Sequence, residues 1–348
     1  MLNYKKHLIK SDSLIKEALI QLEKLAEDAI IFVVDQNEKL IGALTDGDIR
    51  RGLINGVGIN ESINIVLKKN PRFFRKDNYK IEQVIEYRDA FFRIIPILDI
   101  EDRIIKVINF RNVRSYLPID VVIMAGGKGQ RLMPLTKNKP KPLLQVGDKP
   151  IIEHNIDRLV IFGVDNFCIS VNYLGEQIEY YLGNGDNKNI SIEYIKEDKP
   201  LGTIGSISLI KKFHHEYILI INSDILTNID YEHFFMEFIK KDADMAVVTI
   251  PYQVNVPYAV LETRNGKVLD FKEKPTYTYY SNGGIYLLKK SILNHIPQNQ
   301  YFNATDLMET LIKKGNNVIS YPLVGYWLDI GSHDDYKKAQ AEILNIKF

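Results

Sequence analysis

Three glycines and two basic residues lie close together after a short apolar run near the middle of the chain. The glycines are Gly126, Gly127 and Gly129, and the basic residues are Arg131 and Lys141. Glycine opens backbone conformations that other residues avoid, and it lets amide N–H groups approach a polyanion. Arg131 adds a forked, permanently charged donor, and Lys141 adds a point charge between two prolines that stiffen its backbone. This spacing predicts a binding site for a polyphosphate.

The apolar run before the glycines, Ile119 to Ile123, has the length and composition of a buried parallel strand. Ligands bind beyond the carboxyl ends of such strands, so the polyphosphate is expected there. No Gly-Lys-Ser/Thr follows the glycines and no G-x-G-x-x-G occurs among them, which excludes the P-loop and the dinucleotide fingerprint. A glycine turn followed by a solvated basic loop would explain either half alone, but it does not explain the whole run.

Two aspartates follow apolar runs further along the chain. The run YILIINSD ends at Asp224, and YWLDIGSH contains Asp329 after a strand-like run from Tyr321 and before a glycine turn and a predicted helix. Carboxylates at strand ends suit Mg²⁺, which proteins hold with one or two carboxylates plus substrate phosphates. A turn or helix-cap role is the alternative for a single aspartate in such a place, above all for Asp329.

The glycine run matches a longer signature. Residues Gly126–Thr136 match G-G-x-G-x-R-L-x-P-L-T, Pro140–Leu143 match P-K-P-L, and Lys149–Glu153 match K-P-I-I-E. In these motifs, and onward to its carboxyl end, the chain resembles the sugar-1-phosphate nucleotidyltransferases. The resemblance implies an α/β fold, with a Rossmann-like nucleotidyltransferase domain built on a mixed central sheet.

Alternating apolar and helix-like stretches agree with that expectation. A helix is predicted around Gly175 to Leu182 and another from Ile204, each between strand-like runs, which is the rhythm of βαβ units.

The resemblance also implies roles for individual residues. Arg131 and Lys141 would contact the triphosphate, Lys274 would hold the phosphate of the sugar, and Asp224 and Asp329 would bind Mg²⁺. Further nucleotide contacts are implied for Ala125, Gly126, Gly127, Gly129, Gly202 and Thr203, and sugar contacts for Tyr258, Ala259, Glu273, Gly283 and Gly284.

Several of these positions also have a structural alternative. Thr203 could cap a helix, and Glu273-Lys274-Pro275 alone would be an ordinary solvated turn.

Two departures from the family pattern affect the sugar site. Ala259 replaces a glycine found in many relatives, and the segment PQNQYFNATD lacks an arginine that some relatives direct at the sugar phosphate. Lys274 would then carry that charge mostly alone.

Composition predicts an ordinary soluble protein. The chain has 348 residues, with 45 Lys and Arg against 44 Asp and Glu, so a net charge of +1 gives no reason to expect nucleic-acid or membrane binding. No signal peptide or membrane span is evident, which makes the cytoplasm the expected location. The single cysteine, Cys168, lies in an apolar run and is expected to be a buried thiol.

The first part of the chain contains an internal duplication. IIFVVDQNEKLIGALTDGDI from Ile30 aligns with IIPILDIEDRIIKVINFRNV from Ile94, and each copy predicts a strand, an acidic turn, a strand and a helix start, with a helix before it. With GALTDGDI the first copy resembles a cystathionine-beta-synthase (CBS) domain. The predicted organisation is therefore a tandem CBS (α+β) pair in residues 1–116 and a catalytic domain in residues 117–348.

CBS pairs commonly bind adenine nucleotides and regulate an attached enzyme, so an adenine nucleotide is the expected ligand of this part. Thr45 and Asp48 match the family's ligand motif, although capping a helix explains them equally well. In the second copy Asn109 and Asn112 replace them, which argues against a second ligand site. Because CBS pairs often associate, a homo-oligomer is expected.

The expected activity is transfer of a nucleotidyl group to a sugar 1-phosphate with release of pyrophosphate. The CBS fusion resembles guanylyltransferases that make GDP-glucosamine for legionaminic acid, so GTP and glucosamine 1-phosphate are the expected substrates. Mannose- or heptose-1-phosphate guanylyltransferases and cytidylyl- or uridylyltransferases are the alternatives. A glycosyltransferase is disfavoured because Asn222-Ser223-Asp224 does not match the Asp-x-Asp metal motif. A catalytically inactive, nucleotide-sensing regulator is disfavoured because Arg131, Lys141, Asp224 and Asp329 are all present.

Overall fold

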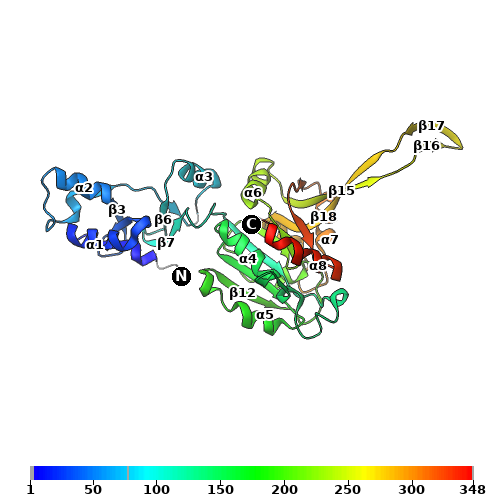
Figure 1. Cartoon of the computed structure of the whole chain (residues 1–348), viewed down its shortest axis with the longest axis horizontal. Helices are drawn as coiled ribbons and strands as arrows, with labels where there is room; N and C mark the ends of the chain where they lie inside the picture. The colour runs from blue at the N-terminus through cyan, green and yellow to red at the C-terminus, as the bar shows by residue number, and fades with distance from the viewer. Residues whose placement is uncertain (1–3, 77, 347–348) are drawn as a thin grey trace. The chain divides into compact units, whose positions relative to one another are not determined.

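The computed structural model describes residues 4–76 and 78–346, so the outermost residues of both predicted domains lie outside the described part. The chain forms two compact units (Figure 1). The first comprises the chain up to Pro118 together with Val160–Gly163 and Asp186–Ile190, and the second comprises the remainder. Among the described helices, none is long and apolar enough to cross a membrane.

The first unit repeats one arrangement of strands. Strand β1 pairs in parallel with β2, which pairs antiparallel with β3, and in the same way β5 pairs with β6 and β6 with β7. The register repeats as well, because Ile30 faces Thr45 as Ile94 faces Asn109. The elements are β1 (Leu8–Lys10), α1 (Ile15–Leu25), β2 (Ile30–Val34), β3 (Leu40–Thr45), α2 (Asp46–Ile54), β4 (Lys68–Lys69), β5 (Phe74–Arg75), α3 (Ile81–Asp89), β6 (Ile94–Leu98) and β7 (Ile104–Asn109).

The two copies share a core but differ at their ends. Phe32 and Val34 of the first copy pack with Ile94 and Leu98 of the second in one apolar cluster. The helix predicted after the second copy is wrong, because residues 110–118 form turns and extended chain. Asn109 explains the difference, since its side chain accepts a hydrogen bond from the N–H of Arg111, 3.0 Å away, and so closes a turn where the first copy starts α2.

The second unit is built on a seven-stranded mixed sheet in the order β12-β11-β8-β13-β18-β15-β19, in which only β18 runs against the other strands. The α/β prediction is confirmed. Its strands are β8 (Ile119–Met124), β11 (Asn166–Val171), β12 (Ser191–Lys196), β13 (Tyr217–Asn222), β15 (Met245–Asn255), β18 (Thr276–Lys289) and β19 (Val318–Pro322).

Helices cover both faces of this sheet. On one face, Ile218 and Ile220 of β13 pack in a cluster with Leu307 and Leu311 of α7 (Ala304–Lys313). On the other, Tyr217 makes edge-to-face contacts with aromatic rings of α6 (Tyr231–Lys240). The other α-helices in the described part of this unit are α4 (Ile151–Ile161), α8 (His333–Glu342) and α5 (Gly175–Leu182), which confirms the helix predicted there.

Two local predictions need correction. The helix expected from Ile204 is only the short 3-10 helix η7 (Gly205–Leu209), since the carbonyls of Gly205 and Ser208 accept hydrogen bonds from the side chains of Ser208 and Gln298. The strand expected from Tyr321 to Asp329 is two strands, since β19 ends at Pro322 and β20 (Trp327–Asp329) pairs with β14 (Ile225–Thr227).

A small apolar cluster lies beneath the β14–β20 pair. Leu226, Leu328 and Ile330 pack there with Leu132 and Leu144, which belong to the segment that follows the glycines. Through this cluster, the segment after the glycines packs against the two strands that carry or adjoin Asp224 and Asp329, so the three are fixed relative to one another. Smaller elements nearby are η4 (Gln130–Leu132), η5 (Lys141–Leu143), β9 (Gln145–Val146) and β10 (Lys149–Pro150).

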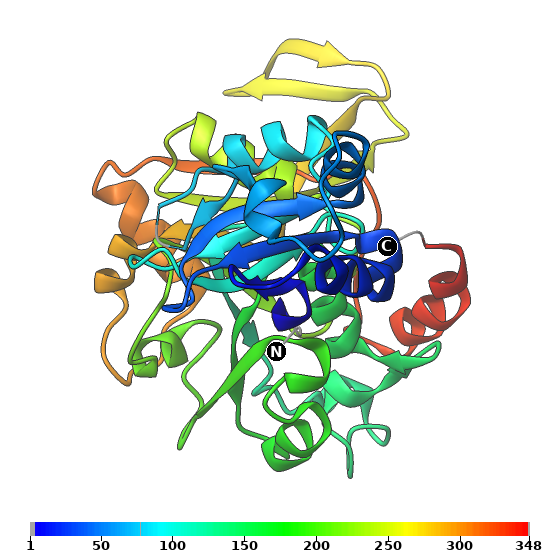
Figure 2. The same cartoon turned by 90° about the vertical axis from the view of Figure 1, so that its left-hand side faces the viewer.

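A two-stranded ribbon projects from the sheet. The outer halves of β15 and β18 remain paired beyond the sheet, and β16 (Val260–Arg264) and β17 (Lys267–Lys272) continue the ribbon to its tip. Figures 1 and 2 both show it extending away from the rest of the unit. The turn at the tip has positive φ at Asn265 and Gly266, as tight hairpins of this twist require.

Candidate active site

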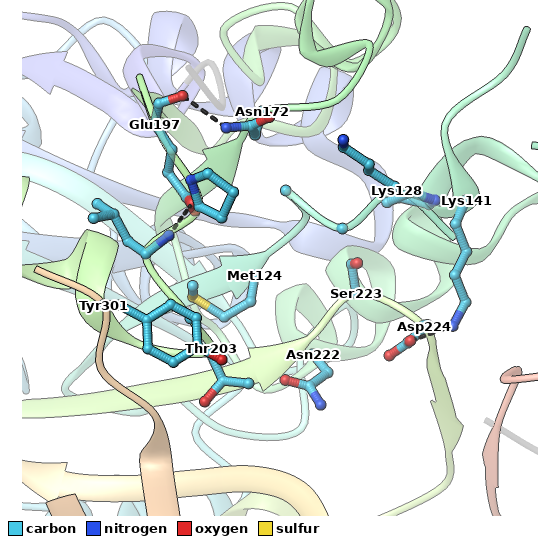
Figure 3. Close-up of a pocket in the computed structure, with 16 residues that line it drawn as sticks. Met124, Lys128, Lys141, Asn172, Glu197, Thr203, Asn222, Ser223, Asp224 and Tyr301 are labelled. Atoms are coloured by element: carbon cyan, nitrogen blue, oxygen red, sulfur yellow. Dashed lines mark hydrogen bonds and ion pairs between the residues drawn. The ribbon is translucent and has the colours of Figure 1, made fainter. Parts of the chain in front are cut away.

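A cavity of about 380 Å³ lies at the carboxyl ends of β8, β11 and β13 (Figure 3). These ends meet because Met124 of β8 lies beside Ser170 of β11 on one side and Asn222 of β13 on the other. The cavity is lined by Met124, Gly126, Gly127, Lys128, Lys141, Pro142, Asn172, Glu197, Pro200, Leu201, Gly202, Thr203, Asn222, Ser223, Asp224 and Tyr301. Open α/β sheets bind ligands at this edge.

The glycine loop starts as a continuation of β8. The N–H of Ala125 donates to the carbonyl of Ser170, 2.8 Å away, so Ala125 is buried in the wall of the sheet. A β-carbon at Gly126 would lie 3.1 Å from Glu197 Oε1, whereas one at Gly127 would meet nothing within 4 Å. Gly127 therefore borders open space, where a ligand can approach its backbone.

The end of the glycine loop, at Gly129, packs closely against Thr136 and Lys141. Gly129 has a φ of 60°, and a β-carbon there would come within 2.9 Å of Thr136 and 3.1 Å of Lys141. Thr136 donates its hydroxyl to the carbonyl of Gly129 at 2.9 Å. Only glycine fits this close approach without strain, so the loop and Lys141 are fixed relative to each other.

Lys141 points between the two aspartates. Its Nζ forms an ion pair with Asp224 and lies 3.8 Å from Asp329 Oδ1. The lysine is only 8% exposed, so its charge acts in a partly dehydrated setting, where electrostatic interactions are stronger than in water. Pro140, extended at a φ of −65°, directs the lysine inward as η5 begins.

The two carboxylates are neighbours across a strand pair. Asp329 lies opposite Ile225 in the β14–β20 ladder, and the N–H of Ile330 donates to the carbonyl of Asp224 at 3.0 Å. In each aspartate Oδ1 is buried without a hydrogen-bond partner among the described residues. Burial raises the pKa of Asp329 and the nearby Asp224 raises it further, while Lys141 and Arg131 lower it.

This pair fits a hard divalent cation. Two buried carboxylate oxygens without donors face a site where their charges repel, and a cation would satisfy both oxygens and relieve the repulsion. No group of three or more His, Cys, Asp or Glu side chains placed to hold a metal occurs among the described residues. The arrangement therefore suits Mg²⁺ shared with substrate phosphates rather than a metal enclosed by protein ligands.

A second cavity, of about 470 Å³, adjoins the first through Gly127, Lys128, Lys141 and Asp224. Arg131 lines it, and a β-carbon at Gly331 would lie 3.2 Å from the guanidinium of Arg131. The glycine loop, two lysines, an arginine and a carboxylate thus border the two adjoining cavities.

Gly202 and Thr203 form the wall opposite the lysines. Gly202 has a φ of 78°, and a β-carbon there would lie 2.7 Å from the carbonyl of Phe302. The hydroxyl of Thr203 accepts a hydrogen bond from the N–H of Ala304 at 2.8 Å, so it caps α7 and not the short helix that follows it in the chain. Tyr301 lies in front of this wall, as Figure 3 shows.

The residues predicted for the sugar site divide into two groups. Gly283 and Gly284 are on β18, where a β-carbon at Gly283 would lie 2.9 Å from the carbonyl of Val248 and one at Gly284 2.7 Å from Asn222 Nδ2. Close packing thus explains both glycines, and neither lines the two cavities. The second group lies exposed on the ribbon and does not line them either; it comprises Tyr258, Ala259, Glu273 and Lys274.

Several cavity residues were missed in the sequence. Glu197 accepts a hydrogen bond from Ser170 Oγ at 2.5 Å and one from the N–H of Leu201 at 3.2 Å, while Asn172 donates to the carbonyl of Glu197 at 2.8 Å. These contacts brace the cavity wall. Lys128 could have been identified from its place between two of the glycines, and Tyr301 lies in the segment PQNQYFNATD, which was considered only for its lack of an arginine, but Asn172 belongs to no motif that the sequence revealed.

In the first unit, Thr45 and Asp48 bond to each other. Thr45 Oγ1 donates to Asp48 Oδ2 at 2.6 Å, and the N–H of Thr45 donates to the same carboxylate at 3.0 Å. The N–H of Asp48 completes a capping box at the start of α2, and Arg51 contacts the other oxygen of Asp48 at 2.5 Å. The structure thus shows the capping role, and a role in binding a ligand stays a prediction.

The fold is of the α/β class with a cavity at the carboxyl ends of its parallel strands, and comparison with known proteins names its family. Residues 120–346 match the nucleotidyl transferase family, and residues 7–55 match the CBS domain. The chain belongs to the nucleotidyl transferase family and carries a CBS domain before its catalytic domain. It is a nucleotidyltransferase.

Individual relatives are similar over the same region. A D-glycero-alpha-D-manno-heptose 1-phosphate guanylyltransferase from Aneurinibacillus thermoaerophilus is 34% identical, over 65% of this chain and 98% of its own. A UTP–glucose-1-phosphate uridylyltransferase from Synechocystis is 29% identical, over 64% of this chain and 63% of its own. The crystal structure of HddC from Yersinia pseudotuberculosis complexed with GMP-PN has a TM-score of 0.50 and 27% identity, over 64% of this chain and 99% of that one.

Proposed function

We propose that the protein transfers the nucleotidyl group of GTP to a sugar 1-phosphate, glucosamine 1-phosphate in the first instance, releasing pyrophosphate and a nucleotide sugar. The observation that carries this proposal is the position of Lys141 between Asp224 and Asp329, beside the open backbone of Gly127. One lysine, two carboxylates and a glycine loop at the same cavity suit a triphosphate with its cation.

The residues of the cavity would act by positioning and charge. Gly127 and the loop around it would meet the triphosphate through backbone N–H groups, while Arg131 and Lys141 would bind its phosphate oxygens. A phosphate oxygen of the sugar 1-phosphate would attack the α-phosphorus in line as pyrophosphate leaves. This oxygen is already nucleophilic, so the reaction needs no protein nucleophile, and catalysis consists of aligning two polyanions and neutralising their charge.

Asp224 and Asp329 would hold Mg²⁺. The ion supplies positive charge for the phosphates and helps to align them. The side chains would contribute the two Oδ1 atoms that lack donors among the described residues.

The choice of base and sugar rests on different observations. GTP is favoured because the heptose relative is a guanylyltransferase and HddC was solved with GMP-PN. Glucosamine 1-phosphate and a role in legionaminic acid synthesis are favoured by the combination of a CBS domain with this transferase. The alternative acceptors are mannose 1-phosphate and heptose 1-phosphate. The alternative activities are those of a uridylyltransferase or a cytidylyltransferase, and the similarity to a uridylyltransferase is the reason to include UTP among the triphosphates tested.

Pyrophosphate release from a panel of four nucleoside triphosphates and several sugar 1-phosphates tests the proposal directly. The highest kcat/KM is expected with GTP and glucosamine 1-phosphate, and ion-exchange chromatography should show the nucleotide sugar. A preference for another pair would replace the substrate assignment but keep the reaction. No release with any pair would contradict the reaction and favour a regulator that only binds nucleotides.

A further inference from the structure

Beyond the Pro251–Tyr280 pair at its base, which lies on the same face as Gln253 and Thr278, the projecting ribbon has one apolar face and one polar face. Side chains alternate between the faces of a strand, and the register places Tyr252 opposite Tyr279 and Val254 opposite Tyr277 on the same face. The next pairs along, Gln253 with Thr278 and Asn255 with Thr276, lie on the other face and are polar. Tyr252 is 62% exposed and Tyr279 is 59% exposed.

The same pattern continues toward the tip. Leu261 lies directly opposite Phe271, and both are more than half exposed. The pair before it, Val260 with Lys272, and the pair after it, Glu262 with Asp270, lie on the other face and include three charged residues. A two-stranded ribbon is marginally stable in water by itself, and contiguous exposed apolar side chains mark contact surfaces. Each half of the ribbon therefore presents exposed apolar side chains that another surface should cover.

The residues predicted to bind the sugar lie at the one irregular place between the two halves of this ribbon. The ladder is regular up to Asn255 opposite Thr276 and resumes at Val260 opposite Lys272. Four residues on one strand face three on the other between these pairs, and Lys274 has a φ of 43° there. Such bulges redirect side chains and are frequent beside active sites. The four predicted sugar-site residues in this bulge are Tyr258, Ala259, Glu273 and Lys274.

The two cavities described above have no cation on the side where the sugar phosphate would approach, whereas the bulge carries Lys274. Among the residues that line them, the cations are Lys128, Arg131 and Lys141, all on the glycine-loop side. An acceptor phosphate needs a further positive charge on its own side, because it must approach a triphosphate that already occupies those three cations. Lys274 would supply that charge, but it is exposed on the ribbon.

We propose that the ribbon, residues 251–280, is an exchanged arm, which covers the cavity of a second copy of this chain and completes its sugar site with Glu273 and Lys274. The proposal rests on the proposed function for the role of these two residues. In a twofold dimer each copy gives its arm and receives one, so one symmetric contact covers both apolar faces and completes both sites.

The hydrogen bonding within the ribbon favours binding to the cavity of a second copy rather than to the cavity of its own chain. One further backbone hydrogen bond enters the bulge, since the N–H of Val256 donates to the carbonyl of Pro275 at 3.0 Å. An extended strand rises about 3.3 Å per residue, so the 15 residues from Ile250 to Arg264 reach roughly 50 Å. A ribbon of this length, which extends away from its own unit with both ladders paired, can reach a neighbouring molecule without breaking hydrogen bonds.

Complementation between two inactive variants tests the exchange. Asp224→Asn damages the cavity and leaves the arm intact, while Lys274→Ala damages the arm and leaves the cavity intact. The two chains, co-expressed with different tags and purified as the mixed dimer, should recover about half of the wild-type turnover, since one of two sites then holds an intact cavity and an intact arm. A mixed dimer no more active than either variant alone, beside an active wild type, would overturn the exchange.

Sedimentation velocity tests the arm without relying on activity. The wild type should be a dimer, and Tyr252→Ser with Tyr279→Ser should raise the dimer dissociation constant at least tenfold. The matched control is Gln253→Ser with Thr278→Ser, the adjacent pair on the polar face, which should leave it unchanged. A monomeric wild type, or equal effects of the two pairs, would overturn the proposal. If the wild type transfers no nucleotide but dimerises through the apolar face, the proposed function fails and the arm contact stands.

Discussion

Lys141 and Asp224 lie 83 residues apart in the chain and form an ion pair where the two cavities adjoin. The lysine is fixed by its contact with Gly129, and the aspartate follows β13 directly. Their pairing joins the glycine segment to the carboxylate side of the site. A triphosphate with its cation would separate these charges and give each a new partner of opposite sign.

Lys141→Met removes this charge while keeping most of the side chain's length. A hydrogen bond to a charged group contributes roughly 1.5–3 kcal/mol, so kcat/KM for the triphosphate should fall roughly 10- to 150-fold. Steady-state pyrophosphate release measures the change. Lys139→Met, two residues earlier in the same loop, is the matched control and should remain near the wild-type value. Equal effects of the two substitutions would contradict a specific role for Lys141.

The carboxylates should control the response to Mg²⁺. Asp224→Asn and Asp329→Asn each remove one predicted ligand, and turnover should fall roughly 10²-fold or more for Asp224→Asn at saturating substrate. The Mg²⁺ concentration for half-maximal rate should rise for both. Asp334→Asn is the control, because its side chain is 95% exposed on α8. Full activity of the wild type in excess EDTA, or of Asp224→Asn in Mg²⁺, would disprove the metal assignment.

Much of this cavity could be predicted because its residues follow strands. Parallel strands bring their carboxyl ends to one edge, so residues after β8 and β13 had to meet there wherever they stand in the chain. Asn172 and Glu197 also follow strands, but one polar residue after a strand is common and carries no spacing signal. Their importance appears only when Glu197 is seen to accept from Ser170 and to lie against Gly126.

The position of the ribbon could not be predicted. Alternating residues such as Tyr252 and Val254 indicate strands with one apolar face, and the Asn265-Gly266 pair predicts a hairpin. Neither pattern says in which direction a hairpin leaves its sheet. The sugar motif at Glu273 and Lys274 indicated proximity to the cavity, yet in the single chain the ladder holds both residues on the exposed ribbon.

Two glycines of the loop should respond differently to the same substitution. Gly129→Ala forces a β-carbon against Thr136 at a φ of 60°, so it should lower the free energy of unfolding by about 1–3 kcal/mol. Gly127→Ala meets no atom within 4 Å and should leave the free energy of unfolding within about 0.5 kcal/mol of wild type, while raising KM for the triphosphate. Urea denaturation and kinetics separate the two effects. An unchanged KM for Gly127→Ala would show that the ligand does not approach this backbone.

Cys168 should be unreactive in the folded protein. Burial raises the pKa of its thiol to about 12, and Glu193 and Asp120 raise it in the same direction. At pH 8 about one thiol in ten thousand would then be ionised, and the thiolate is the reactive form. A disulfide reagent at pH 8 should therefore modify the native protein only at the rate of unfolding, and the denatured protein at once. Rapid modification of the native protein would show that the thiol is accessible.

The capping box of Thr45 and Asp48 should stabilise the first unit whether or not a nucleotide binds there. Asp48→Ala removes the acceptor of two hydrogen bonds from Thr45 and the partner of Arg51, so the free energy of unfolding should fall by about 1–2 kcal/mol. Asp46→Ala, on the same turn, loses only an exposed pair with Arg50 and should cost less than about 0.5 kcal/mol.

Calorimetry on the full chain then separates the capping role from ligand binding. Heat from ATP or AMP that disappears in Asp48→Ala but persists in Asp46→Ala would assign Asp48 to a nucleotide site as well as to the cap. Thermal melts without ligand should show both variants folded at the temperature of the titration. If neither adenine nucleotide gives any heat with the wild type, the expected adenine-nucleotide site in the CBS domain is contradicted, and the cap is the function that the two side chains retain.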